Sequence, residues 1–143
     1  MELQQLIDQK IKQARQERLL QNDQLTLGQI IQKIEGLADK TATIQYDFEY
    51  YFPKSIDSWR GSYDELALDI HSGGGNELTA LQFIDILKEA IDNTYTGYKG
   101  GEFTMSEETP VWVANYGNSG NTAVVDVIDD GWRAIIVTGF REY

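Results

Sequence analysis

The sequence predicts an α+β fold, with N-terminal helices and a further helix packed on a mainly antiparallel sheet that ends in a C-terminal β-meander. Three observations lead to this class. Apolar side chains recur at helical spacing near the N-terminus, two later segments have the Thr-x-x-Gln spacing of a helix capping box, and the last third alternates strand-forming runs with turn residues. Strands joined by short turns pair antiparallel. The apolar face of such a sheet must be buried, so helices or a second subunit must cover it.

The N-terminal segment is typical of an amphipathic helix of about four to five turns. Its apolar stripe is narrow for a core helix, so we expect it to pack on another subunit or on an edge of its own domain. We divide the chain into residues 1–22, a helix that is a candidate for oligomerisation, and residues 23–143, a single α+β ligand-binding domain. Leu3, Ile7, Ile11, Ala14 and the charged Arg18 recur at spacings of three and four residues, beside Leu6.

Two shorter helices are predicted to begin at capping boxes, the first formed by Thr26 and Gln29 and the second by Thr79 and Gln82. The first of them ends near Gly36. The apolar residues that follow the boxes are Leu27, Ile30, Ile31, Ile34 and Leu37 in the first helix, and Phe83, Ile84, Ile86, Leu87, Ala90 and Ile91 in the second.

The remaining chain is rich in strand signals. Residues 42–52 form one predicted strand, stopped by Pro53, and residues 65–71 alternate as a second strand up to a triple glycine. The intervening residues 54–62 are expected to form a loop. The C-terminal meander consists of residues 110–114, 122–128 and 132–138, with a turn at residues 115–121 and a hairpin signal at Asp129-Asp130-Gly131.

The composition indicates one globular domain. The 143 residues are 41% apolar and 24% charged, which excludes a mainly disordered chain. No apolar run is long enough to span a membrane, and the N-terminus has no secretory signal pattern. With no Cys and one His, the chain cannot form disulfides, use a thiol nucleophile or build a multi-histidine metal site within one subunit.

The net charge of −11 lies in residues 41–143, because acidic and basic residues cancel in residues 1–40. Such an acidic body repels the phosphate backbone of nucleic acids, so we expect no DNA or RNA polymer as a partner. A small anionic ligand is still compatible, since a few Arg, Lys and backbone N–H groups can hold one or two phosphates.

No catalytic constellation is evident, and we expect neither enzyme activity nor a cofactor. His71 follows a predicted strand beside glycines. Without an evident Ser or Cys partner, it is interpreted as a surface or packing residue. The carboxylate pairs Glu107-Glu108 and Asp129-Asp130 lie in turn-like stretches and are interpreted as solvated loop charges rather than metal ligands.

Residues 57–64 are predicted to form a loop, and the loop contains residue types that can bind a nucleotide. Arg60 lies between two aromatic residues, one of which is Trp59, and such a loop could stack a base or clamp a phosphate. The alternative is structural: Arg60 pairs with Asp57 or Asp64, and Trp59 fills the core. These residues alone do not decide between the two.

Residues 96–104 are a second candidate, because they combine Lys99 with glycines and flanking hydroxyl groups. Their exposed backbone amides would suit a phosphate nest. They lack the spacing of a P-loop, however, and the change from strand to helix that accompanies it. A wide hairpin turn is the better interpretation of this segment taken alone.

The order of these motifs resembles the first type of Thoeris anti-defence protein, a small family of phage proteins. The most specific parts are Ser58-Trp59-Arg60-Gly61 and the stretch from Tyr98 to Thr104, within a likeness over about residues 25–138. The resemblance implies a non-catalytic sponge that sequesters a cyclic ADP-ribose isomer, with a cyclic oligonucleotide as a further ligand of some members. It would act in the cytoplasm of the infected bacterial host and block TIR-dependent signalling.

The resemblance also implies roles for individual residues. Arg60 would grip the pyrophosphate, Phe83 would stack on a base, and Asn93 would hydrogen-bond a base or ribose, while the stretch from Lys99 closes around phosphate or ribose. The implied ligand-binding set is Trp59, Arg60, Phe83, Asn93, Tyr98, Lys99, Gly100, Phe103 and Thr104, with Arg15 and Arg18 as candidates for a second nucleotide pocket.

We further expect a homo-oligomer, either a dimer or a hexamer, because a narrow-striped helix and an open sheet leave apolar surface uncovered. Three other functions remain open. An acidic protein could mimic nucleic acid and inhibit a basic host or defence protein. Converging carboxylates with magnesium could hydrolyse a nucleotide. The chain could also be a phage structural or accessory domain whose aromatic residues are simply core.

Overall fold

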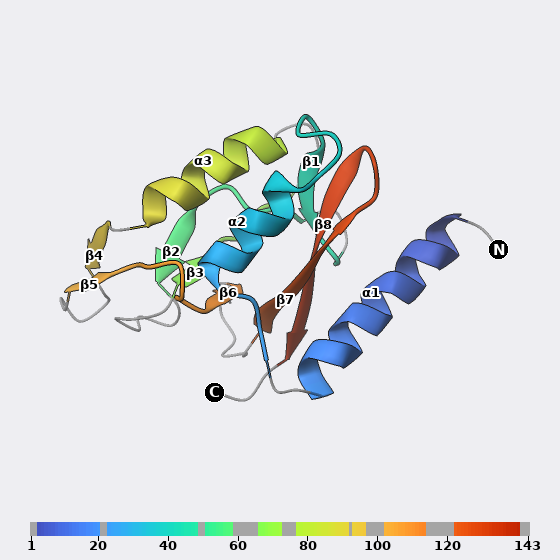
Figure 1. The fold of residues 1–143 in the computed structure, drawn as a ribbon, viewed down its shortest axis with the longest axis horizontal. Helices are drawn as coiled ribbons and strands as arrows, with labels where there is room; N and C mark the ends of the chain where they lie inside the picture. Colours follow the sequence, from blue (N-terminus) through green and yellow to red (C-terminus); the bar gives the residue numbers. More distant parts are fainter. Residues whose placement is uncertain are drawn as a thin grey trace.

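The computed structural model confirms the α+β class (Figure 1). It describes residues 3–20, 23–48, 51–58, 66–72, 77–91, 93–96, 102–113 and 122–140. The helices are α1 (Leu3–Leu20), α2 (Leu27–Glu35) and α3 (Ala80–Ala90). The strands are β1 (Thr43–Tyr46), β2 (Ile56–Ser58), β3 (Leu66–Leu68), β4 (Thr94–Thr96), β5 (Glu102–Thr104), β6 (Val111–Val113), β7 (Thr122–Asp129) and β8 (Arg133–Phe140). Within these ranges, no helix is long and apolar enough to cross a membrane.

Six of the described strands form one mixed sheet in the order β1-β8-β7-β6-β3-β2. The predicted meander is confirmed, because β6, β7 and β8 are consecutive antiparallel neighbours. The sheet is not purely antiparallel, since β1 runs parallel to β8 and β3 runs parallel to β6. Parallel neighbours need a long connection, which α3 and the β4–β5 hairpin supply between β3 and β6. The prediction considered only strands joined by short turns and therefore missed both parallel pairs.

The sheet is apolar on both faces, and helices cover each face. Leu66 and Leu68 of β3 belong to the same core as α2 and α3, whereas Ala67 belongs to a separate cluster on the opposite face. On that opposite face, Ile11 of α1 packs against the cluster that contains Trp112. Figure 1 shows α2 and α3 together on one side of the sheet and α1 on the other. The narrow apolar stripe of the N-terminal helix thus packs on the sheet of its own chain.

Local sequence signals located several elements correctly. Both capping boxes form, one between Thr26 and Gln29 and the other between Thr79 and Gln82. The β7–β8 hairpin turns at Gly131, whose φ of 84° lies in the left-handed region that favours glycine. These elements were predictable because their signals depend on neighbouring residues alone.

Other predictions needed correction. The strand expected over residues 42–52 is limited to β1, and the loop expected over residues 54–62 contains β2. The alternation expected for residues 65–71 is absent from β3, whose residues are all buried because helices cover both faces of the sheet. The turn predicted at residues 115–121 lies outside the described residues.

A buried carboxylate fastens α1 to the sheet. The side chain of Asp47, directly after β1, is 1% exposed, and it accepts hydrogen bonds from the backbone N–H and the Oγ1 of Thr138 at 3.0 and 2.7 Å. The guanidinium of Arg15 on α1 lies 2.5 Å from the same carboxylate, and its Nε donates to the Thr138 carbonyl at 2.7 Å. The docked helix therefore neutralises a charge that burial would otherwise penalise.

Replacing this carboxylate should weaken the fold. We expect Asp47→Ala to lower the free energy of unfolding by about 2 to 3 kcal/mol, because Thr138 and Arg15 lose a charged partner. Arg15→Ala should cost about 1 kcal/mol, since water then reaches the carboxylate. Urea unfolding followed by circular dichroism measures both, with Asp85→Ala on the exposed face of α3 as the control. Unchanged stability of Asp47→Ala would show that α1 is held by apolar packing alone.

Candidate functional site

One segment that the sequence singles out for ligand binding, residues 59–65, connects β2 to β3 at the end of the sheet where β6 begins. β2 ends at Ser58 and β3 begins at Leu66, and these residues pair in register. Leu66 also pairs with Val111, the first residue of β6, and its N–H donates to the Pro110 carbonyl at 3.4 Å. The connection of residues 59–65 therefore starts beside the segment that leads from the β4–β5 hairpin into β6.

The β4–β5 hairpin follows directly from the end of α3. Residues 94–96 pair antiparallel with residues 102–104, so residues 97–101 connect the two strands, and the hairpin interpretation of this segment is confirmed. At its base, the N–H of Met105 donates to the Asn93 carbonyl at 3.2 Å, and Met105 is buried in the core. The hairpin is thus anchored on the side of the sheet that α2 and α3 cover.

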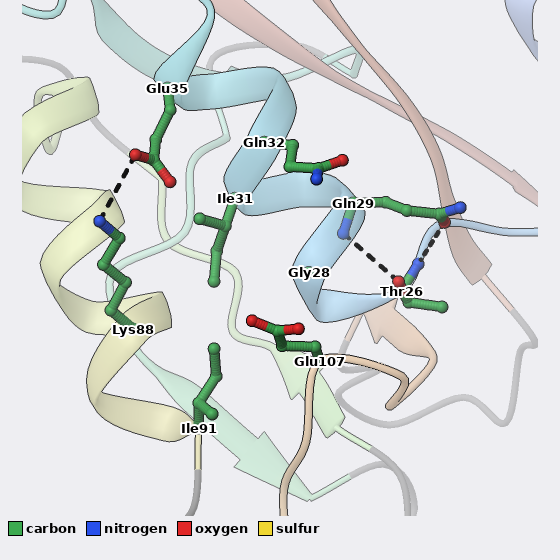
Figure 2. A pocket seen from close by; sticks show the side chains of 9 residues that line it. All are labelled: Thr26, Gly28, Gln29, Ile31, Gln32, Glu35, Lys88, Ile91 and Glu107. Atoms are coloured by element: carbon green, nitrogen blue, oxygen red, sulfur yellow. Dashed lines mark hydrogen bonds and ion pairs between the residues drawn. The ribbon is translucent and has the colours of Figure 1, made fainter.

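A cavity of 580 Å³ lies between α2, α3 and residues 105–109 (Figure 2). This volume is typical of small-molecule pockets, which measure about 300 to 1,000 Å³. Figure 2 shows Ile31 and Ile91 on opposite sides, with the Glu107 carboxylate pointing between them. The Nζ of Lys88 lies 3.5 Å from the Glu35 carboxylate and joins α3 to α2. The lining is completed by Thr26, Gly28, Gln29 and Gln32.

One wall of the cavity depends on a close approach between α2 and residues 105–109. The N–H of Gly28 donates to the Glu107 carbonyl at 2.9 Å. A Cβ on Gly28 would lie 3.0 Å from the Cβ of Glu107 and 3.1 Å from its carbonyl oxygen. Glycine at this position therefore lets the two segments meet. The next amide, that of Gln29, is bound by the Thr26 hydroxyl in the capping box at 3.3 Å.

The structure describes part of the predicted ligand-binding set. Phe103 and Thr104 belong to β5, and Thr104 is exposed. Asn93 is exposed at the junction of α3 and β4, where its side-chain amide donates to the Glu89 carbonyl. Phe83, in contrast, is fully buried in the core, so in this structure its ring offers no surface on which a base could stack. The predicted site residues outside the described part of the chain are Trp59, Arg60, Tyr98, Lys99 and Gly100.

The two arginines expected to serve a second pocket have partners within the chain. Arg15 pairs with Asp47 as described above, and Nη1 of Arg18 lies 3.1 Å from the Asp23 carboxylate. Arg15 also lines a smaller cavity of 370 Å³, together with Phe140 at the end of β8. Both ion pairs orient α1 relative to the rest of the chain.

A separate polar cluster surrounds Asp69, directly after β3. Burial alone would raise the pKa of this carboxyl. Hydrogen bonds from the backbone N–H groups of Lys54 and Ser55, the Ser55 hydroxyl and His71 outweigh the effect of burial and hold the pKa below its usual value. Ser55 Oγ donates to Asp69 at 2.6 Å, so its proton is directed to the carboxylate rather than to the imidazole. With its ring against Phe52, the half-exposed His71 is consistent with a packing residue.

Of the two acidic pairs, Glu107-Glu108 lies in a turn as predicted, whereas Asp129 ends β7 and Asp130 follows it at the hairpin. Asp129 accepts the N–H of Gly131 at 2.8 Å, and Asp130 pairs with Arg133 at 2.8 Å. Glu107 and Glu108 are exposed in the turn before β6. Across the described residues, no group of three His, Asp or Glu side chains is placed to hold a metal ion.

Comparisons of the chain with known protein families, curated proteins and solved structures found no match. The likeness to the first type of Thoeris anti-defence protein therefore rests on the sequence motifs themselves. The function that this likeness implies is accordingly a proposal.

The cavity between α2 and α3 was not predicted from the sequence. Its polar residues Gln32, Glu35 and Lys88 occupy ordinary exposed positions of amphipathic helices. A local signal was Gly28, because glycine is a poor helix former and is uncommon in a first turn without a packing reason. That packing reason, the approach of residues 105–109, depends on the tertiary fold.

Gly28→Ala should destabilise the protein by about 1 to 3 kcal/mol, because the added methyl forces α2 and Glu107 apart. Gly36→Ala is the matched control. At Gly36, a Cβ would meet only carbonyl oxygens at 3.5 Å, and its φ of −81° suits alanine. The control should therefore be neutral or stabilising by about 0.4 to 1 kcal/mol. Thermal unfolding measures both, and equal melting temperatures for the two variants would contradict the close contact.

The lowered pKa of Asp69 predicts a specific loss of stability in acid. A carboxyl whose folded-state pKa lies below its unfolded value of about 3.9 stabilises the fold above that pH, and this contribution is lost as the pH falls further. The stability difference between the wild type and Asp69→Asn should therefore be constant near pH 7 and shrink below about pH 4. Urea unfolding from pH 7 to about pH 3 tests this. Asp85→Asn, at an exposed position of α3, is the matched control.

Proposed function

We propose that the protein is a non-catalytic sponge that binds and sequesters a cyclic nucleotide messenger, a cyclic ADP-ribose isomer in the first place. The proposal combines the sequence resemblance with one observation: β3, which follows the Trp59-Arg60 segment, pairs with β6, the strand that follows the β4–β5 hairpin. Ser58 and Leu66 flank the Trp59-Arg60 segment, and Leu66 pairs with the strand that follows the β4–β5 hairpin. Segments far apart in the sequence could thus contribute to one site.

The chemistry of the two segments suits the parts of such a ligand. Arg60 and Lys99 would bind the phosphates, since a guanidinium can donate two parallel hydrogen bonds to phosphate oxygens. Aromatic side chains of the same segments, such as Trp59 and Tyr98, would stack on a base. Asn93, exposed where α3 meets β4, would bind a base or ribose edge. Phe83 is not part of the proposed surface, because its ring lies in the core.

The proposal assigns the polar clusters of the described residues to the fold. The Asp69 carboxylate is hydrogen-bonded to Lys54, Ser55 and His71. In the acidic pair, Asp129 accepts a hydrogen bond from the Gly131 N–H, and Asp130 forms an ion pair with Arg133. In this proposal these groups stabilise the structure and take no part in chemistry on the ligand. A sponge of this kind would work in the cytoplasm of the infected host, as a dimer or hexamer.

Ligand binding should stabilise the protein and leave the ligand intact. A ligand that binds only the folded state at a thousandfold excess over its Kd adds about 4.1 kcal/mol, which raises the melting temperature by several degrees. We expect this shift with a cyclic ADP-ribose isomer and a smaller one with open-chain ADP-ribose, AMP or ATP. Mass spectrometry after heat denaturation should recover the cyclic ligand unchanged.

Arg60→Ala and Lys99→Ala should each remove most of the shift, whereas Lys12→Ala, at an exposed position of α1, should preserve it. Recovery of a cleaved ligand would identify an enzyme instead. If no cyclic nucleotide shifts the melt, the proposal fails and an acidic inhibitor that mimics nucleic acid becomes the leading alternative. Such an inhibitor would lose its protein partner at high salt.

A further inference from the structure

We infer that the cavity between α2 and α3 is a binding site for a nucleoside, with an amino-substituted base and its ribose as the groups that it accommodates. The inference rests on the proposed function, because the cavity would hold the nucleoside part of the same ligand whose phosphates bind at the hairpin end. Its residues differ from those named for the phosphates, so the two proposals can be tested separately.

The cavity has the dimensions and the apolar walls that a flat ring requires. Its 580 Å³ would accept a nucleoside with room for a connected phosphate group. Ile31, on α2, and Ile91, at the end of α3, face each other across it, as Figure 2 shows. Two branched aliphatic side chains on opposite sides can sandwich the faces of a base and remove them from water.

The polar groups of the cavity favour a ligand that donates hydrogen bonds. Glu107 directs its carboxylate between the two isoleucines, and Glu35 contributes a second carboxylate at the far end. The ammonium of Lys88 is held 3.5 Å from Glu35. A carboxylate accepts hydrogen bonds and offers none. Glu107 is therefore suited to the exocyclic amine of a base or to the hydroxyl groups of a ribose.

The same geometry disfavours phosphate inside the cavity. With two carboxylates and one ammonium group, the lining has a net negative charge. A helix N-terminus can attract anions through free amides, but here the Leu27 and Gly28 amides donate to carbonyls of residues 105–109 at 2.9 Å. The Gln29 amide is bound by the Thr26 hydroxyl. Phosphates of a bound nucleotide would thus have to lie outside.

The chain connects the cavity to the hairpin over short distances in sequence. Ile91 lies two residues before Asn93, which precedes β4, and Glu107 follows closely after the end of β5 at Thr104. β4 therefore follows the wall that contains Ile91, and β5 leads into the wall that contains Glu107. One ligand could place its base in the cavity and its phosphates against the hairpin.

Nuclear magnetic resonance titration with adenosine tests the inference without any phosphate. We expect adenosine to shift the amide signals of Ile31 and Ile91, and inorganic pyrophosphate to leave both unchanged. Glu107→Gln should weaken adenosine binding about tenfold or more, because a charged acceptor is lost while the Glu107 carbonyl still holds Gly28. Inosine, whose ring has a carbonyl in place of the amine, should bind more weakly than adenosine to the wild type.

Glu108→Gln is the matched control, since it makes the same change one residue away, in the same exposed turn and outside the cavity lining. It should bind adenosine like the wild type. The inference is overturned if adenosine leaves Ile31 and Ile91 unshifted, or if both variants weaken it equally. It is also overturned if Glu107→Gln binds cyclic ADP-ribose as tightly as the wild type, in which case the sponge proposal stands alone. Glu107-dependent adenosine binding without any cyclic nucleotide binding would support the cavity and refute the sponge.

Discussion

The fold depends on a sheet whose central strands are apolar on both faces. Leu66 and Leu68 face α2 and α3, while Ala67 and Trp112 face α1, so neither side of these strands can be left to water. Removing apolar surface from water is the main favourable term in folding. The positions of all the described helices follow from it. The buried pair of Arg15 and Asp47 then sets how α1 lies across its face.

Much of the fold could be predicted because its signals are local. The capping boxes at Thr26 and Thr79 need only a hydroxyl and a glutamine three residues later, and the hairpin at Gly131 needs a residue that tolerates positive φ. The parallel pairs could not be predicted in this way. Thr43, for example, has no property that selects Arg133 as its neighbour. The strand β2, which pairs antiparallel with β3, was missed for another reason: its residues Asp57 and Ser58 carry no strand signal.

The sequence proposes residue types for the candidate site but does not determine their geometry. Arg60 and Lys99 are selected from their residue types and surroundings, since phosphate recognition uses few kinds of side chain, whereas Asn93 is implied by the family resemblance alone. Phe83 shows the limit of that reasoning. In the sequence, an apolar residue at helical spacing is equally compatible with a core position and with a ligand-binding surface. In the structure, α2 packs against α3 and Phe83 lies in the core. The cavity near Gly28 likewise exists only through tertiary contact.

The parallel pairing of β1 with β8 has a consequence for synthesis on the ribosome. Tyr46 leaves the exit tunnel long before Ile136, its partner in the sheet. Until then, Ile44 and the apolar face of α2 have no finished sheet to pack against. Nascent chains with such late-closing contacts expose apolar surface and are prone to aggregation during translation. Production of the protein should accordingly benefit from low temperature, which weakens association of apolar surfaces, and from chaperones that cover apolar surface on nascent chains.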